Sequence, residues 1–83
     1  MKTIILTDKA AREFDNLDSK AREQVSEGLY QYAVGGQGDV KRLAGRDGFR
    51  LRIGRYRVIF DEDKTTILAV YVGKRETTTY RKN

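Results

Sequence analysis

Apolar residues change their spacing along the chain, and each spacing indicates a different kind of element. Residues 2–6 (KTIIL) are a short β-branched run, which is typical of a strand. Residues 9–17 and 20–34 instead place apolar side chains three or four positions apart, as on one face of a helix. Residues able to cap these two helices precede each of them: Thr7 and Asp8, then Asp18 and Ser19. The side chains expected to face the core are Ala10, Phe14, Leu17, Ala21, Val25, Leu29, Tyr32 and Ala33.

The second half of the chain has the pattern of antiparallel strands. Residues 35–39 (GGQGD) break the second helix, because three glycines in five residues favour an open loop. Gly54 and Arg55 have the form of a two-residue type II′ hairpin turn. Residues 66–72 (TILAVYV) are nearly all apolar, which is typical of a strand buried on both faces at the centre of a sheet. The order β-α-α-β-β-β predicts an α+β fold, with two N-terminal helices packed on one face of a small antiparallel sheet.

A turn at Gly54 and Arg55 divides the hairpin into an apolar face and a basic face. The pairs expected on one face are all apolar: Ile53 with Tyr56, Leu51 with Val58, and Phe49 with Phe60. On the other face Arg52 lies opposite Arg57, and Arg50 lies opposite Ile59. We therefore expect the apolar face to join the core and the arginines to converge on the solvent side.

The basic character of the chain belongs to its second half. The whole chain carries a net charge of +5. Residues 1–40 hold five Lys and Arg against seven Asp and Glu, a net charge of −2. Residues 41–83 hold twelve against five, a net charge of +7. Such a basic surface suggests a nucleic acid, an acidic protein or a membrane face as partner.

The arginine face favours phosphate as its ligand. Like charges directly opposite each other across two strands destabilise a sheet, and no carboxylate lies between Gly48 and Phe60 to offset them. Each guanidinium is a planar fork of donors that matches phosphate oxygens. An ordinary solvated face, or a face that docks an acidic protein, is the alternative interpretation.

Several other kinds of site are excluded or disfavoured by composition. The chain has no Cys and no His, so it has no disulfide, no thiolate metal site and no imidazole acid–base pair. Residues 61–63 (DED) can bind a cation, but a solvated turn is the simpler interpretation. Residues 35–38 (GGQG) lack the ending of a phosphate-binding Walker loop. We expect one cytoplasmic domain over residues 1–83, with no signal peptide, membrane span, metal, cofactor or small-molecule ligand.

The chemistry that remains is cationic. Arginines can stabilise the charge of a phosphorane-like transition state in RNA cleavage without a metal. Arginine stays protonated and is a poor base, so another group must move the protons. Lys74 and Tyr80 are available for that role in the C-terminal tail.

Residues 41–60 (KRLAGRDGFRLRIGRYRVIF) and 67–80 (ILAVYVGKRETTTY) resemble the RelE/ParE superfamily of bacterial type II toxins. The resemblance covers nearly the whole chain, loosely before residue 40 and closely after it. It is closer to the RelE branch, whose members cleave mRNA in the ribosomal A site without metal, using the 2′-hydroxyl as nucleophile. The resemblance implies a cognate antitoxin and a ribosome with mRNA in its A site as partners.

Site residues follow from the resemblance position by position. Arg57 matches the arginine that contacts the scissile phosphate, Arg75 matches a second catalytic arginine, and Tyr80 resembles the tyrosine that follows it. Arg50 takes the place of a catalytic lysine. The other basic residues expected to bind RNA phosphates are Arg52, Arg55, Lys74, Lys41 and Arg42.

Three departures from the RelE pattern affect the expected chemistry. Arg50 keeps the charge of the family lysine but loses a group able to deprotonate. A further active-site lysine of the family falls on Gly48, and Tyr80 lies one residue closer to Arg75 than in the family pattern. The resemblance thus assigns phosphate contacts but leaves the general base open. A ParE-type toxin that inhibits DNA gyrase without cleaving RNA, and a basic module that binds an acidic partner, stay as alternatives.

Overall fold

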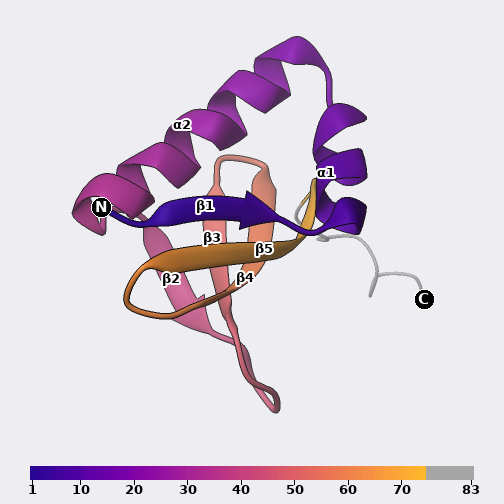
Figure 1. The fold of residues 1–83 in the computed structure, drawn as a ribbon. Coiled ribbons are helices and arrows are strands. Elements are labelled where there is room, and N and C mark those ends of the chain that lie inside the picture. The colour runs from indigo at the N-terminus through magenta and orange to yellow at the C-terminus, as the bar shows by residue number, and fades with distance from the viewer. Residues whose placement is uncertain (75–83) are drawn as a thin grey trace.

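The computed structural model describes residues 1–74, which form a two-layer arrangement of helices and a sheet (Figure 1). Its elements are β1 (Thr3–Leu6), α1 (Asp8–Asp15), α2 (Ser19–Gly35), β2 (Asp39–Arg42), β3 (Phe49–Ile53), β4 (Tyr56–Glu62) and β5 (Thr66–Lys74). The strands form one sheet in the order β1-β5-β4-β3-β2. This arrangement confirms the predicted α+β fold.

Both helices begin at the residues that the sequence offers as caps. The side-chain oxygen of Thr7 accepts a hydrogen bond from the Ala10 N–H at 3.1 Å, and an Asp18 carboxylate oxygen accepts one from the Ala21 N–H at 2.8 Å. Each bond satisfies a first-turn donor that has no partner within its own helix. Of the paired candidates, Thr7 and Asp18 are therefore the caps.

The central hairpin has the predicted turn and register. Gly54 has φ +59°, and among the described residues no residue other than glycine has a positive φ, so the turn is type II′ and not type I′. The pairing of β3 with β4 follows the expected alternation, with Leu51 opposite Val58 and Arg52 opposite Arg57. The apolar face of the hairpin therefore turns inward, and its arginines turn outward.

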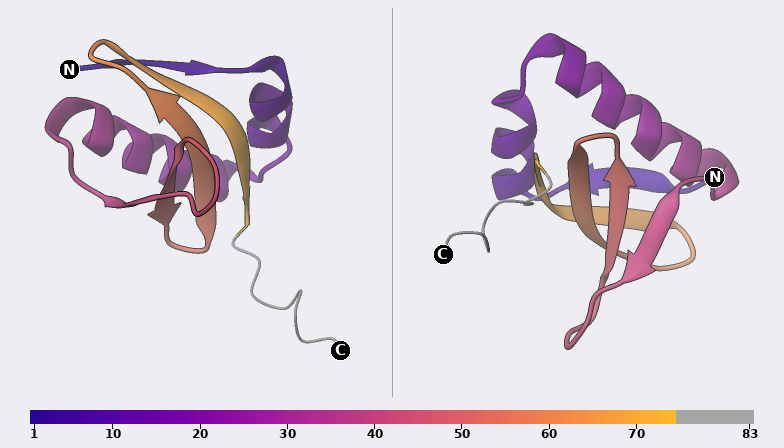
Figure 2. Two further views of the ribbon diagram at one scale, coloured as in Figure 1. Left: turned by 90° about the horizontal axis from the view of Figure 1, so that it is seen from below. Right: turned by 180° about the vertical axis from the view of Figure 1, so that it is seen from behind.

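The core lies between α2 and the inward face of the sheet. Figure 2 (left) shows α2 passing behind β3 and β4. The buried side chains from the two layers are Ala10, Val25, Leu29, Ala33, Leu51, Val58, Phe60, Ile67, Ala69 and Val72. The Phe60 ring lies 5.4 Å from the Tyr32 ring and 5.5 Å from the Phe49 ring, centroid to centroid. This packing fixes which face of the hairpin remains open.

The sheet differs from the prediction in two pairings. It is mixed, because β1 runs parallel to β5 while the other pairs are antiparallel. The two helices after β1 separate it from the later strands, and it enters the sheet on the free edge of β5.

Residues 39–42, for which no element was predicted, pair with β3 as an edge strand. Their side chains are mostly exposed, so no apolar alternation marks them as a strand.

Strand β5 is flanked by β1 and β4, but it is not buried on both faces as predicted. Ile67, Ala69 and Val72 are buried, whereas Leu68 is exposed. A register shift between Ile59 and Phe60 places one extra β5 residue in the ladder. Side chains of β5 therefore reach the face of the sheet opposite α2 as well as the core.

Candidate nucleic-acid interface

The side of the sheet opposite α2 carries a cluster of cations, here called the arginine face. Register places Arg50 opposite Ile59 and Arg52 opposite Arg57 on this face. Lys41 of β2 lies opposite Arg50 and extends the cluster to the sheet edge. The predicted convergence of Arg50, Arg52 and Arg57 is therefore present in the structure.

Two arginines of this face have buried donors without a protein acceptor. The Nε atoms of Arg50 and Arg57 are buried, and neither makes a hydrogen bond within the described part of the chain. Buried donors normally find acceptors, because an unpaired one loses the hydrogen bonds that water provides. The two ion pairs found among residues 1–74 involve lysines and not these arginines. An anion on this face can supply the missing acceptors.

Carboxylates lie at the margins of the arginine face. Asp39 of β2 is opposite Arg52, and Asp61 follows Ile59 on the same side of β4. Neither forms an ion pair within the described residues. The centre of the arginine face therefore carries only positive charges, and its edges carry both positive and negative charges.

A hollow of about 600 Å³ opens on the arginine face beside Arg57. The residues that line it come from α1, the loop after β2, β4 and β5: Lys9, Leu43, Ala44, Arg46, Arg57, Ile59, Val70 and Tyr71. The Arg57 guanidinium carbon lies 5.7 Å from the centroid of the Tyr71 ring, and the Lys9 Nζ lies 5.0 Å from it. Three cations and one aromatic ring thus meet around an apolar floor.

Other predicted site residues lie away from this hollow or outside the described residues. Arg55 is exposed in the β3–β4 turn. Arg42 stacks over the Phe49 ring at 5.3 Å, on the opposite face of the sheet. Lys74 is opposite Tyr56 and by register points to that same opposite face. Arg75 and Tyr80 fall outside residues 1–74.

Lys9, Arg46 and Tyr71 were missed by the sequence prediction. Tyr71 lies in an apolar run that favours a core position, and the register shift in β5 is what brings it to the open face. Lys9 carries a weak local signal, because a cation in the first turn of a helix opposes the helix dipole.

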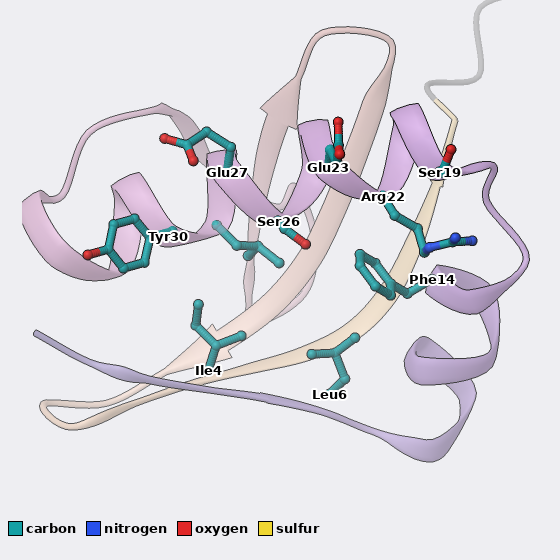
Figure 3. A pocket seen from close by; sticks show the side chains of 10 residues that line it. Ile4, Leu6, Phe14, Ser19, Arg22, Glu23, Ser26, Glu27 and Tyr30 are labelled. Atoms are coloured by element: carbon teal, nitrogen blue, oxygen red, sulfur yellow. The ribbon is translucent and has the colours of Figure 1, made fainter.

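A second, larger hollow of about 1100 Å³ lies between β1, α1 and α2, away from the arginine face (Figure 3). Ile4, Leu6 and Phe14 point toward α2 in this view. The Arg22 guanidinium at its rim donates to the main-chain oxygens of Asp15 and Leu17. The exposed surface of this hollow is mainly apolar, whereas the arginine face on the other side of the sheet is basic.

Neither a metal cluster nor a membrane-spanning helix is found in the part of the chain that the structure describes. No three His, Cys, Asp or Glu side chains within residues 1–74 are placed to hold a metal ion. No helix in the same range is both long and apolar enough to cross a bilayer.

Solved structures of RelE toxins share this arrangement of a helix pair on a five-stranded mixed sheet. The isolated Escherichia coli RelE toxin superposes with a TM-score of 0.75 and 21% identity, covering 93% of this chain and 87% of that one. A chain of the intact E. coli RelBE toxin–antitoxin complex gives 0.72 and 21%, covering 93% and 100%. The Staphylococcus aureus YoeB dimer gives 0.70 and 20%, covering 92% and 98%. The fold of this chain is therefore that of the RelE-like toxins.

Comparisons at the level of sequence give no further assignment. No family model matches the chain. No curated protein matches it either.

Proposed function

We propose that this chain is the toxin of a type II toxin–antitoxin pair and acts as a ribosome-dependent mRNA endonuclease. The observation that carries the proposal is the arginine face, where the buried Nε donors of Arg50 and Arg57 lack acceptors within the described residues. The proposal is supported by the RelE-like fold on which this face is built. A phosphate of mRNA in the ribosomal A site is the anion that the face is proposed to bind.

The proposed reaction is an internal displacement at phosphorus. The 2′-oxygen of one nucleotide forms a bond to the phosphorus, and the bond from phosphorus to the 5′-oxygen of the next nucleotide breaks. The products are a 2′,3′-cyclic phosphate and a 5′-hydroxyl, while one proton leaves the 2′-hydroxyl and one joins the leaving oxygen. The enzyme must therefore stabilise extra negative charge on the phosphoryl oxygens and assist two proton transfers.

Arg57 and Arg50 are proposed to stabilise the phosphoryl charge. They lie on adjacent strands as diagonal neighbours, and their side chains share the open face. Because both stay protonated, neither is assigned as the base. Arg75 and Tyr80 remain proposed members of the site by resemblance alone. Arg52 and Lys41 extend the basic surface along which the RNA backbone is proposed to lie.

A cognate antitoxin is the proposed regulatory partner in the cytoplasm. The E. coli RelBE structure to which this chain is similar is a toxin–antitoxin complex. An antitoxin segment with acidic and apolar side chains is suited to mask the arginine face. Its binding also stabilises the folded toxin by mass action, since it binds the native chain and not the unfolded one.

The test is cleavage of a defined mRNA on purified stalled ribosomes by wild type and Arg57→Ala. We expect wild type to cut within the A-site codon and Arg57→Ala to lose at least 100-fold in rate, the scale of losing one preorganised charge contact (about 10²–10³). Lys64→Ala, which removes an exposed cation from the β4–β5 turn, is the matched control and should cut normally. Equal cutting by Arg57→Ala and Lys64→Ala contradicts the assignment of Arg57.

A further inference from the structure

The Tyr71 ring occupies an unusual position in the hollow on the arginine face. It lies within 5.0 Å of the Lys9 Nζ and 5.7 Å of the Arg57 guanidinium carbon, measured to the ring centroid. The side chain is only half-buried, although it belongs to an otherwise apolar strand. The two cations lie over parts of the ring, and the ring surface that stays open can stack against a base while the cations beside it bind phosphate.

Gly73 creates the space that this ring occupies. It lies directly opposite Arg57 in the β4–β5 ladder, so its missing side chain leaves a gap beside the guanidinium. A Cβ atom added to Gly73 would collide with the hydroxyl end of Tyr71. The ring therefore lies along the strand over Gly73, and this glycine determines how close Tyr71 comes to Arg57.

Glu13 holds Lys9 over the same strand. One Glu13 carboxylate oxygen accepts a 2.6 Å bond from the Lys9 Nζ, and the other accepts a 3.0 Å bond from the main-chain N–H of Val72. Burial opposes ionisation of Glu13, but the bonds from Lys9 and Val72 outweigh it and hold the pKa of Glu13 below its ordinary value. The carboxylate thus fixes Lys9 next to the residue that follows Tyr71.

Local helix energetics favour Lys9 only weakly, through its ion pair with Glu13. A cation in the first turn of α1 opposes the helix dipole, and Lys preceding Glu by four residues is the weaker orientation of such a pair. The floor of the hollow is apolar, formed by side chains such as Ile59 and Val70. Its volume of about 600 Å³ falls within the usual range for small-ligand sites.

We propose that this hollow is a nucleotide subsite in which Tyr71 stacks against one base of single-stranded RNA, while Lys9 and Arg57 bind phosphates next to that base. The proposal rests on the proposed function, because it takes mRNA as the ligand. It adds α1 and β5 to a surface otherwise formed by β2, β3 and β4. Lys9 and Tyr71 are binding residues in this account, and Glu13 is a positioning residue.

The experiment measures affinity for a short single-stranded oligoribonucleotide without ribosomes, by anisotropy and by NMR titration to millimolar RNA. Tyr71→Leu should bind about 5- to 150-fold more weakly, as expected for the loss of one stacked base. Tyr71→Phe keeps the ring and should restore most of the affinity. Tyr30→Leu, which alters an exposed tyrosine of α2, is the matched control and should bind as wild type. Thermal midpoints confirm that each variant is folded.

Gly73→Ala tests the position of the Tyr71 ring over Gly73 without removing any side chain proposed to bind RNA. The backbone of Gly73 does not have the left-handed φ of Gly54, so alanine fits the strand and only the Tyr71 ring must move. We expect Gly73→Ala to lose affinity as Tyr71→Leu does. An oligoribonucleotide lacking the stacked base should bind wild type and Tyr71→Leu equally, because the two deletions remove the same interaction.

Lys9→Gln tests the phosphate contact. It should reduce the slope of log affinity against log salt by about 0.7, the value for one phosphate contact on a single strand. Lys20→Gln, which alters an exposed lysine of α2, should leave the slope unchanged.

Three results overturn the subsite: no binding at millimolar RNA, unchanged affinity in Tyr71→Leu, or equal losses in Tyr71→Leu and Tyr30→Leu. Ribosomal cleavage is scored separately from oligoribonucleotide binding. Binding that depends on Tyr71 in a protein that cuts no mRNA supports the subsite and contradicts the proposed endonuclease. If wild type cuts mRNA on the ribosome and Tyr71→Leu binds the oligoribonucleotide as tightly as wild type, the subsite is contradicted and the proposed endonuclease is not.

Discussion

Arg52 and Arg57 stand opposite each other on adjacent strands, an arrangement that is unfavourable without an anion between or above them. Their side chains are half-buried, so solvent screens the repulsion only in part. A residue pair that weakens the fold is expected where function requires it, because selection retains stability only above a threshold. Under the proposed function, the arginine pair links the stability of the fold to the binding of phosphate.

Arg52→Thr should separate the effect of the arginine pair on stability from its effect on RNA binding. Removing one like charge and adding a β-branched side chain should raise the free energy of unfolding by about 0.2–1 kcal/mol. The same change should weaken RNA binding. Urea unfolding at low salt and an RNA titration give the two quantities. A destabilised Arg52→Thr variant with intact RNA binding contradicts this account of the pair.

The position of a single side chain could be predicted from the sequence only where the alternation of residues along a strand decides which face of the sheet it lies on. Arg50, Arg52 and Arg57 could be assigned to one face because a two-residue turn determines the register of the hairpin. Lys9 and Tyr71 could not, since their meeting depends on how α1 packs on β5 and on the shift in that strand. Arg42 and Lys74 were grouped with the site by charge, and register places both on the opposite face.

At the scale of elements, Glu13 joins α1 to the sheet through the Val72 N–H. This contact is long-range, and it holds the helix that delivers Lys9 to the hollow. Within α1 only Ala10 is fully buried, and Phe14 packs against the core as a partly buried side chain. A single carboxylate is therefore an important part of the attachment between this helix and β5.

Glu13→Ala should lower the free energy of unfolding by about 1–2 kcal/mol at pH 7, through the lost hydrogen bonds and the unpaired Val72 N–H. The folded pKa of Glu13 lies below its ordinary value of 4.5, so the charge-dependent part of this stabilisation is complete above that value. It is lost as the pH falls through the lower folded pKa. Urea unfolding at pH 7 and at pH 3 tests this. A difference between variant and wild type that does not shrink at pH 3 contradicts the role of the carboxylate.

Elements defined by local signals were predicted well. The caps at Thr7 and Asp18 and the turn at Gly54 are encoded by neighbouring residues, and the structure has all three. The parallel pairing of β1 with β5 joins strands about 60 residues apart, which no local pattern encodes. Strand β2 was missed because it is stabilised by the free edge of β3 and not by apolar side chains of its own.

At the scale of the whole molecule, the two faces of the sheet have separate roles. One face packs against α2 and builds the core, while the other carries the arginine face and its hollow. An apolar hollow of about 1100 Å³ lies on the α2 side of the sheet, between β1, α1 and α2 (Figure 3). The arginines of the arginine face therefore lie on a surface that contributes little to the core.

The most direct test of the proposed endonuclease uses ribosomes programmed with two mRNAs that differ by one oxygen atom. One carries a normal A-site codon, and the other carries a 2′-deoxynucleotide at the position cut in the first. We predict that wild-type protein cuts the first mRNA, leaving a 2′,3′-cyclic phosphate, and leaves the second intact. Cutting of both mRNAs contradicts internal attack by the 2′-hydroxyl. Two intact mRNAs from a folded, toxic protein contradict the endonuclease itself and favour the gyrase-inhibiting alternative.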